Sequence, residues 1–156
     1  IRVFCSLDKT IKIHKSLEKK ILNTEKNFEK MFFKMNDFLS SWKKNKKKEI
    51  LDLNKKFGPL KAKAFPGRAA ILIKLLSLDN DSIEAVYEIK GSIKTGNFVP
   101  GTRIPILPEK ELYESKYNGP ILNLAWHLPF EVRENLLKNG FKGRVYDILS
   151  NELIQN

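Results

Sequence analysis

The sequence predicts an α/β fold, in which a small parallel sheet with flanking helices follows a long amphipathic helix. The pattern changes at Gly58, after which short apolar runs alternate with helix-like stretches in the order strand, helix, strand, helix, strand. Before Gly58, apolar residues recur at three- and four-residue steps between positions 17 and 42. We therefore expect the end of a preceding domain with a linker over residues 1–15, a long helical segment over 16–57 and the α/β domain over 58–156.

The first five residues have the pattern of a terminal strand. Residues 1–5 are too few to form a sheet by themselves, and the chain begins at Ile1 without a methionine. We therefore expect a fragment whose first strand completes a preceding domain.

Composition narrows the class of protein. No run of 18 apolar residues is present, so we expect no membrane span. Cys5 is the single cysteine, which excludes an internal disulfide and a cysteine metal cluster. We expect a reducing, cytoplasmic setting and no metal site.

The net charge of +11 is concentrated in one stretch, residues 43–63. Its nine lysines are Lys43, Lys44, Lys46, Lys47, Lys48, Lys55, Lys56, Lys61 and Lys63. Such a cluster can meet nucleic-acid phosphates or an anionic membrane surface, and it can equally be a solvated helix face. Trp42 and Phe57 are the only interleaved aromatic residues, so we do not expect nucleic acid to be the partner.

The long helix is predicted to start near Ser16 and to end at Gly58-Pro59. Its apolar stripe, rich in Phe and Met, must pack on another surface. The following domain and a second subunit, in a homodimer through this helix, are the two alternatives. A membrane-lying helix fits less well, because Asn23, Asn27 and Asn36 interrupt the neighbouring faces.

The α/β part is predicted to consist of short strands and helices whose ends are well marked in the sequence. We expect strands over 60–65, 83–89, 121–126 and 144–149, and helices over 69–76, 109–116 and 129–139. The helix over 69–76 is nearly all apolar and should be buried against the sheet. Ligands of parallel sheets bind where the loops gather at the carboxyl ends of the strands, here residues 65–68, 88–102 and 126–131.

Residues 94–107 are the most informative loop. Pro100-Gly101 is a turn dipeptide, Gly96 allows a positive φ, and Pro105 blocks a helix. We expect an ordered loop that runs into a short extended piece over 104–107. A ligand-binding loop and a rigid connector between strands both remain open.

Three motifs in order resemble one family. They are Ala64-Phe65-Pro66-Gly67-Arg68-Ala69-Ala70-Ile71-Leu72, then Lys94-x-Gly96-x-x-x-Pro100-Gly101-Thr102-x-Ile104-Pro105-Ile106, and then Leu124-Ala125-Trp126-His127-x-x-x-Glu131. Together they resemble the C-terminal domain of S-adenosylmethionine-dependent sugar C-methyltransferases, over roughly residues 58–149. The family adds a methyl group to a keto-deoxysugar that is attached to a nucleoside diphosphate.

The resemblance implies a Rossmann-like domain that binds a sugar nucleotide and is inactive alone. It implies that a preceding methyltransferase domain holds S-adenosylmethionine, so we expect no cofactor on this fragment. The substrate-binding residues, with Glu88 added from its place at a strand end, are Pro66, Gly67, Arg68, Glu88, Lys94, Gly96, Pro100, Gly101, Thr102, Trp126, His127 and Glu131. Ala64 and Ala69 stand where the family has glycines, which stiffens the first turn.

Methyl transfer to such a sugar needs a general base next to the ketone and a group that stabilises the enolate. His127 is the candidate base in this chain, although a histidine at a strand end is often structural. The alternative function is a basic helical interaction module over residues 16–57 that binds nucleic acid, anionic lipid or a partner helix, with the α/β part as scaffold.

Overall fold

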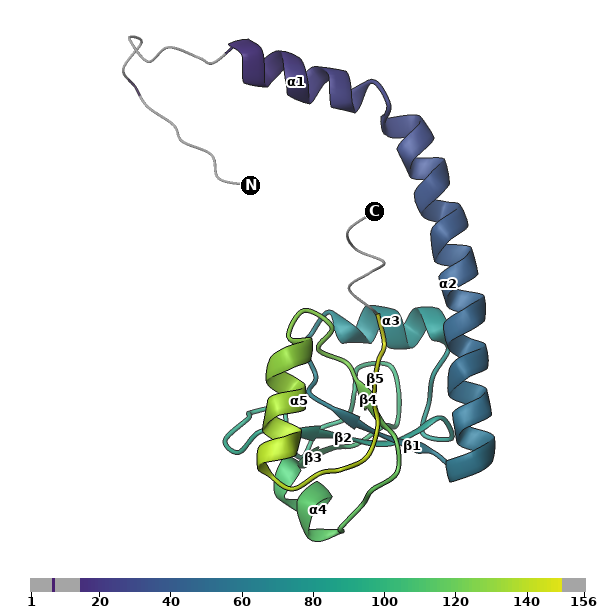
Figure 1. Cartoon of the computed structure of the whole chain (residues 1–156), viewed down its shortest axis with the longest axis vertical. Coiled ribbons are helices and arrows are strands. Elements are labelled where there is room, and N and C mark those ends of the chain that lie inside the picture. The colour runs from purple at the N-terminus through teal and green to yellow at the C-terminus, as the bar shows by residue number, and fades with distance from the viewer. Residues whose placement is uncertain (1–6, 8–14, 150–156) are drawn as a thin grey trace. The chain divides into compact units, whose positions relative to one another are not determined.

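The computed structural model describes Leu7 and residues 15–149 (Figure 1). The chain divides into two compact units, Ile1–Ser41 and Trp42–Asn156, and the boundary falls inside a helix. The terminal strand expected over residues 1–5 lies outside the described residues. No helix in the described part is long and apolar enough to cross a membrane.

The first unit is helical. It holds α1 (Lys15–Glu25) and the first part of α2 (Phe28–Phe57), separated at Lys26 and Asn27. The long helical segment expected from residue 16 is therefore two helices. Leu17, Ile21, Phe28, Met31, Phe32, Met35 and Leu39 are exposed members of the predicted apolar stripe.

The second unit contains a five-stranded parallel sheet, which confirms the predicted fold class. The strands are β1 (Leu60–Lys63), β2 (Ile83–Glu88), β3 (Ile106–Pro108), β4 (Ile121–Asn123) and β5 (Val145–Asp147), in the order β3-β2-β1-β4-β5. This is the order of a Rossmann-like sheet, and its switch point lies between β1 and β4.

Helices cover both faces of the sheet (Figure 1). They are α3 (Ala69–Leu76), α4 (Glu109–Glu114), α5 (Pro129–Lys138) and the C-terminal half of α2. Leu112 of α4 and Val132 and Leu136 of α5 pack with Tyr87 and Ile121 on one face. On α2, Trp42 and Ile50 are buried, and the Trp42 indole donates a hydrogen bond to the Ile148 carbonyl oxygen at 3.3 Å.

The helix α3 is less buried than its composition suggested. Ala69, Ile73 and Leu76 are buried, whereas Ile71 is 61% exposed and Leu75 is 39% exposed. One face of a helix meets the sheet, so an all-apolar helix must leave part of its surface uncovered. The expected burial against the sheet therefore applies to one face of this helix.

The informative loop is a short hairpin that covers the outer edge of β3. The Val99 amide donates to the Ile104 carbonyl oxygen at 2.9 Å, and the Ile106 amide donates to the Asn97 carbonyl oxygen at 2.8 Å. At its tip Gly101 has φ +75°, and the Thr102 amide donates to the Val99 carbonyl oxygen at 3.0 Å. The predicted Pro-Gly turn is confirmed, and pairing protects an edge strand that would otherwise be open.

Candidate functional site

Two of the predicted site residues meet at the carboxyl ends of β1 and β2. The Glu88 carboxylate accepts a hydrogen bond from the Phe65 amide at 2.5 Å, and the Lys94 ammonium donates to the Phe65 carbonyl oxygen at 2.6 Å. The Lys94 Nζ and Glu88 Oε1 atoms are 3.7 Å apart. Glu88 is 7% exposed, so its charge is held by these contacts rather than by water. We call Glu88 and Lys94 the Phe65 clamp.

The clamp lies next to a strained residue. Ala64 has φ +61°, a left-handed conformation that residues other than glycine rarely adopt. Its amide donates to the Tyr87 carbonyl oxygen at 3.0 Å, so β2 holds both Ala64 and Phe65. Strained residues of this kind persist where the surrounding structure over-determines them, often at functional sites.

Pro66, Gly67 and Arg68 form the turn from this strand into α3. The Pro66 carbonyl oxygen accepts the Ala69 amide at 2.7 Å, and Arg68 occupies the N-cap position without a side-chain capping bond. A Cβ atom added to Gly67 would meet no atom within 4 Å, and Gly67 is not among the glycines with positive φ. The glycine at this position is therefore not required by the backbone.

The hairpin residues satisfy their polar groups within the hairpin. The Thr102 hydroxyl donates to the Val99 carbonyl oxygen at 2.9 Å and accepts the Ile104 amide at 3.1 Å. Gly96 has φ +84°, and Pro100 and Gly101 are the two central residues of the turn. These four predicted site residues, Gly96, Pro100, Gly101 and Thr102, build the hairpin.

Trp126, His127 and Glu131 follow β4, on the other side of the switch point. The rings of Trp126 and His127 meet edge to face, with centroids 5.6 Å apart. His127 and Glu131 are exposed, and no hydrogen bond joins either side chain to another residue in the described part of the chain. Among the described residues, no hydrogen bond or ion pair joins them to the Phe65 clamp.

Sequence reasoning missed a polar network on the α4 and α5 side of the sheet. Lys63 is 2% exposed, and its ammonium donates to Glu109 Oε2 at 2.6 Å. The Tyr113 hydroxyl lies 3.4 Å from the same oxygen and donates to Asn135 Oδ1 at 2.8 Å. Burial, and secondarily the nearby Glu109 charge, raises the pKa of Tyr113.

A second network lies at the carboxyl ends of β4 and β5. The fully buried Asn123 amide donates to Asp147 Oδ1 at 2.8 Å, and Arg133 donates to Asp147 Oδ2 at 2.6 Å. Asn123 Oδ1 accepts the Ala125 amide at 2.9 Å. These bonds fix the start of the loop that carries Trp126 and His127.

A cavity of about 830 Å³ opens between the loop after β2 and α4. Its walls start at the carboxyl ends of β2 and β3, the edge at which ligands of parallel sheets bind. It is lined by Ile89, Lys90, Gly91, Ser92, Thr95, Pro108, Glu109, Lys110, Glu111, Tyr113, Glu114 and Asn139. We call it the β2–α4 cavity.

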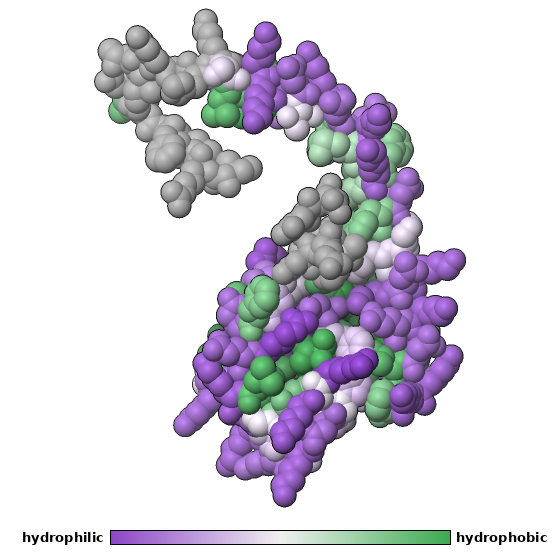
Figure 2. All heavy atoms as spheres, viewed as in Figure 1, coloured by the Kyte–Doolittle hydropathy of each residue, from purple (hydrophilic) through white to green (hydrophobic). Residues whose placement is uncertain are grey.

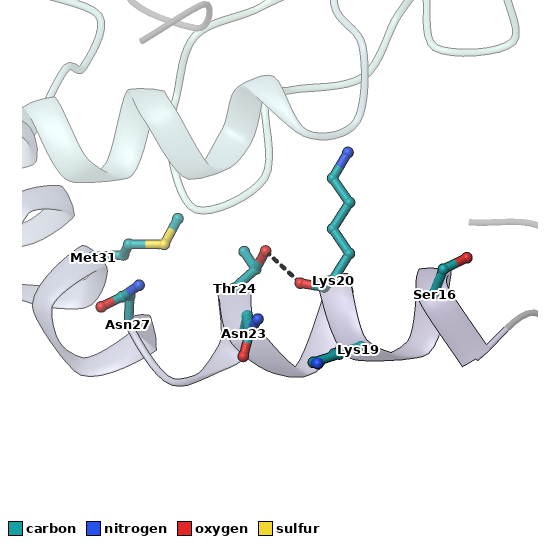
Figure 3. Close-up of a pocket in the computed structure, with 7 residues that line it drawn as sticks. All are labelled: Ser16, Lys19, Lys20, Asn23, Thr24, Asn27 and Met31. Atoms are coloured by element: carbon teal, nitrogen blue, oxygen red, sulfur yellow. Dashed lines mark hydrogen bonds between the residues drawn. The ribbon is translucent and has the colours of Figure 1, made fainter.

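The first unit has a groove of about 550 Å³ along α1 and the start of α2 (Figure 3). Lys19, Lys20, Thr24, Asn27 and Met31 are among its lining residues. The one hydrogen bond drawn there runs from the Thr24 hydroxyl to the Lys20 carbonyl oxygen at 3.0 Å, within a single helical turn. The polar lining has no buried charged group.

The lysine cluster lies largely on the outer side of α2. Residues 42–57 hold seven lysines and two acidic residues, and Figure 2 shows hydrophilic side chains along this half of the helix. Lys43, Lys44, Lys47 and Lys48 are exposed and form no ion pair with another described residue. Lys46 differs, because it pairs with Glu49 and donates to the Asp147 carbonyl oxygen at 3.0 Å.

Comparison with known families now adds a direct assignment. The model of the C-methyltransferase C-terminal domain matches residues 1–144. The chain belongs to this family. A search of curated proteins found no match. Membership confirms the resemblance carried by the three motifs, as far as a C-methyltransferase C-terminal domain, and the match covers the helical segment and strands β1 to β4 but ends just before β5.

Proposed function

We propose that this domain binds the substrate of an S-adenosylmethionine-dependent C-methyltransferase that acts on a nucleotide-linked keto-deoxysugar, and that it is inactive alone. Family membership is the observation that carries the proposal. The donor would be held by a methyltransferase domain, and the setting would be the cytoplasm. The predicted domain limits of 1–15, 16–57 and 58–156 belong to the same proposal.

The arrangement of the carboxyl edge supports a binding role. A general base must be positioned within hydrogen-bond reach of the proton it takes, and a third group usually orients it. His127 is exposed and has no orienting hydrogen bond among the described residues. By contrast, Glu88 and Lys94 fix the turn after β1, and the β2–α4 cavity opens at the same edge. These features suit a domain that orients a substrate for chemistry performed elsewhere.

A backbone NMR titration tests the proposal. The labelled chain is titrated at moderate salt with thymidine, uridine, cytidine and guanosine diphosphate sugars. Saturable shifts in residues 65–68, 88–102 and 126–131 for one nucleotide are expected. Lys94→Met should weaken this binding, while Lys142→Met, an exposed lysine beside a separate cavity, should leave it unchanged.

If the isolated chain shows no chemical-shift changes, the same titration is repeated on the polypeptide that includes the methyltransferase domain. Binding there would show that the site needs both domains. Absence of binding there, for every sugar in the panel, contradicts the proposed substrate class.

The exposed lysines of α2 favour one second candidate, a basic surface that meets a polyanion or an anionic membrane. Lys43 and Lys47, like Lys44 and Lys48, are like charges at i and i+4, which repel each other on an isolated helix. A phosphate-rich partner would relieve that repulsion. Binding of this kind is independent of sequence and falls steeply with salt, which separates it from saturable nucleotide-sugar binding.

The exposed stripe of the first unit is proposed as the contact for the methyltransferase domain or for a second copy of the chain. Light scattering during size exclusion gives the mass of the isolated chain. A dimer that Met35→Glu converts to a monomer supports the second copy, and a monomer at all concentrations excludes it for the isolated chain.

A further inference from the structure

Lys63 is a charged side chain placed inside the sheet layer. It follows Ala62 on β1 and shares a sheet face with Tyr87 and Ile121, which pack against Leu112 and Leu136. Burying an ammonium among such residues is costly unless an opposite charge is close. Glu109, 46 residues further along the chain, supplies that charge at 2.6 Å.

The ion pair fixes one oxygen of Glu109 and leaves the other free. Lys63 occupies Oε2. The single phenolic hydrogen of Tyr113 goes to Asn135 at 2.8 Å, so the 3.4 Å approach of Tyr113 to Oε2 adds contact without a second strong bond. No hydrogen bond from a described residue reaches Oε1. The Glu109 side chain is 18% exposed and lines the β2–α4 cavity.

We propose that the β2–α4 cavity takes the sugar ring of the substrate and that Glu109 Oε1 accepts a hydrogen bond from a ring hydroxyl. This inference rests on the proposed function and names the part of the substrate that the cavity holds. A carboxylate held in one rotamer by a buried lysine is a pre-organised acceptor, which loses little entropy when a ligand donates to it.

The lining of the β2–α4 cavity offers both apolar surface and polar groups, which a sugar ring needs. Ile89, Pro108 and the ring of Tyr113 provide apolar surface for the faces of a pyranose, and Ser92 and Thr95 add hydroxyl groups. A volume of about 830 Å³ exceeds what a single ring needs, so part of the diphosphate can enter as well.

Charge sets the direction in which the ligand enters. The negative Glu109 repels phosphate, and the exposed Lys90, which forms no ion pair with another described residue, attracts it, whereas Lys110 is paired with Glu114 at 3.4 Å. The sugar therefore points to Glu109 and the diphosphate to the rim near Lys90.

Glu109→Gln tests this arrangement in the chain form that binds the panel sugar. Glutamine keeps the shape, but with its amide oxygen on Lys63 it places an NH2 donor where Oε1 stood, so the charge-assisted acceptor for the sugar hydroxyl is lost. We expect binding to weaken about tenfold. Glu134→Gln is the matched control, because Glu134 is an exposed glutamate on α5 that lines neither the β2–α4 cavity nor the other described cavities, and its ion pair with Lys138 is exposed. It should change binding less than about twofold.

A deoxy analogue of the sugar, which lacks the hydroxyl proposed to donate to Glu109, completes a thermodynamic cycle with Glu109→Gln. It should bind the natural chain about tenfold more weakly and should bind Glu109→Gln with little further loss. If Glu109→Gln does not fold, as judged by its NMR spectrum, Glu109→Asp withdraws the carboxylate by one methylene and should also weaken binding.

The outcomes separate this inference from the proposed function. Saturable binding that is equal in Glu109→Gln and Glu134→Gln, with shifts confined to residues 65–68 and 126–131, overturns the assignment of the cavity and leaves the substrate class standing. Failure of the whole panel to bind, with the methyltransferase domain present, overturns both.

Discussion

The buried ion pair between Lys63 and Glu109 predicts an asymmetric response to mutation. Lys63 is 2% exposed and Glu109 is 18% exposed, so the two partners differ in how well water can replace the lost contact. Glu109→Leu leaves an ammonium without a counter-charge in the core and should cost about 3–5 kcal/mol of unfolding free energy. Lys63→Met leaves a carboxylate that water reaches, and methionine fills the volume of the lysine stem, so a cost of about 1 kcal/mol is expected.

The double variant should recover most of the loss. Lys63→Met combined with Glu109→Leu removes both charges and should be about 1 kcal/mol less stable than the natural chain. The two changes then couple by about 3–5 kcal/mol in favour of the double variant. Urea unfolding followed by circular dichroism measures each free energy, with an unchanged slope as the sign that the unfolded state is the same.

A matched pair on the same strand serves as the control. Lys61, two residues before Lys63, pairs with Glu84 at 3.0 Å, and Glu84 is 52% exposed. Glu84→Leu should therefore change stability by less than about 1 kcal/mol. Equal costs for Glu109→Leu and Lys63→Met, or costs that add in the double variant, would show that the burial of Lys63 does not control the energetics.

Three further predictions concern the backbone and pH. Gly101→Ala should destabilise the chain by about 1–2 kcal/mol because φ is +75° there, whereas Gly67→Ala should be neutral or slightly stabilising; thermal melts compare the two. Ala64→Gly should raise stability by about 0.5 kcal/mol through relief of its left-handed strain, and a lowered melting temperature would count against that strain. Because burial raises the pKa of Tyr113 in the folded state, the stability it contributes is complete below pH 10 and is lost as pH rises above it. Tyr113→Phe should therefore flatten the fall in unfolding free energy between pH 9 and pH 11, and an identical fall in both proteins would argue against the burial effect.

Local chemistry allowed most of the fold to be predicted. Pro100 and Gly101 specify a turn through φ alone, and Gly140, with φ +81°, follows the end of α5. The break between α1 and α2, at Lys26 and Asn27, contains no glycine or proline from which it could have been predicted. Breaks without such residues depend on packing, which a periodicity argument does not contain.

The site was harder to predict than the sheet because its members are distant in sequence. Strand alternation places Lys61 and Lys63 on one face, and a parallel sheet covered on both sides leaves little water there, with Lys63 2% and Lys61 11% exposed. That reasoning would have marked Lys63 as a buried charge. It would not have found Glu109, whose position depends on how α4 packs. The hydrogen bond from the Phe65 amide to Glu88 could not be predicted from the sequence either, because it also depends on how distant segments pack.

The contacts of the turn after β1 explain how the chain keeps an alanine in a strained conformation. Ala64 adopts φ +61° at a position where the resemblance leads us to expect glycine, and a left-handed conformation costs an alanine about 1–2 kcal/mol. The Phe65 clamp holds both polar groups of Phe65, at 2.5 Å to the amide and 2.6 Å to the carbonyl oxygen. These bonds, together with that from the Ala64 amide to Tyr87, offset the strain.

The same bonds restrict what the turn can bind. A backbone amide that recognises phosphate must be free to donate, and the Phe65 amide already donates to Glu88. The Glu88 carboxylate also repels an approaching anion. The Phe65 amide is therefore not available to bind phosphate in this chain. In the binding mode proposed above, the diphosphate instead meets Lys90, an exposed lining residue of the β2–α4 cavity that forms no ion pair with another described residue.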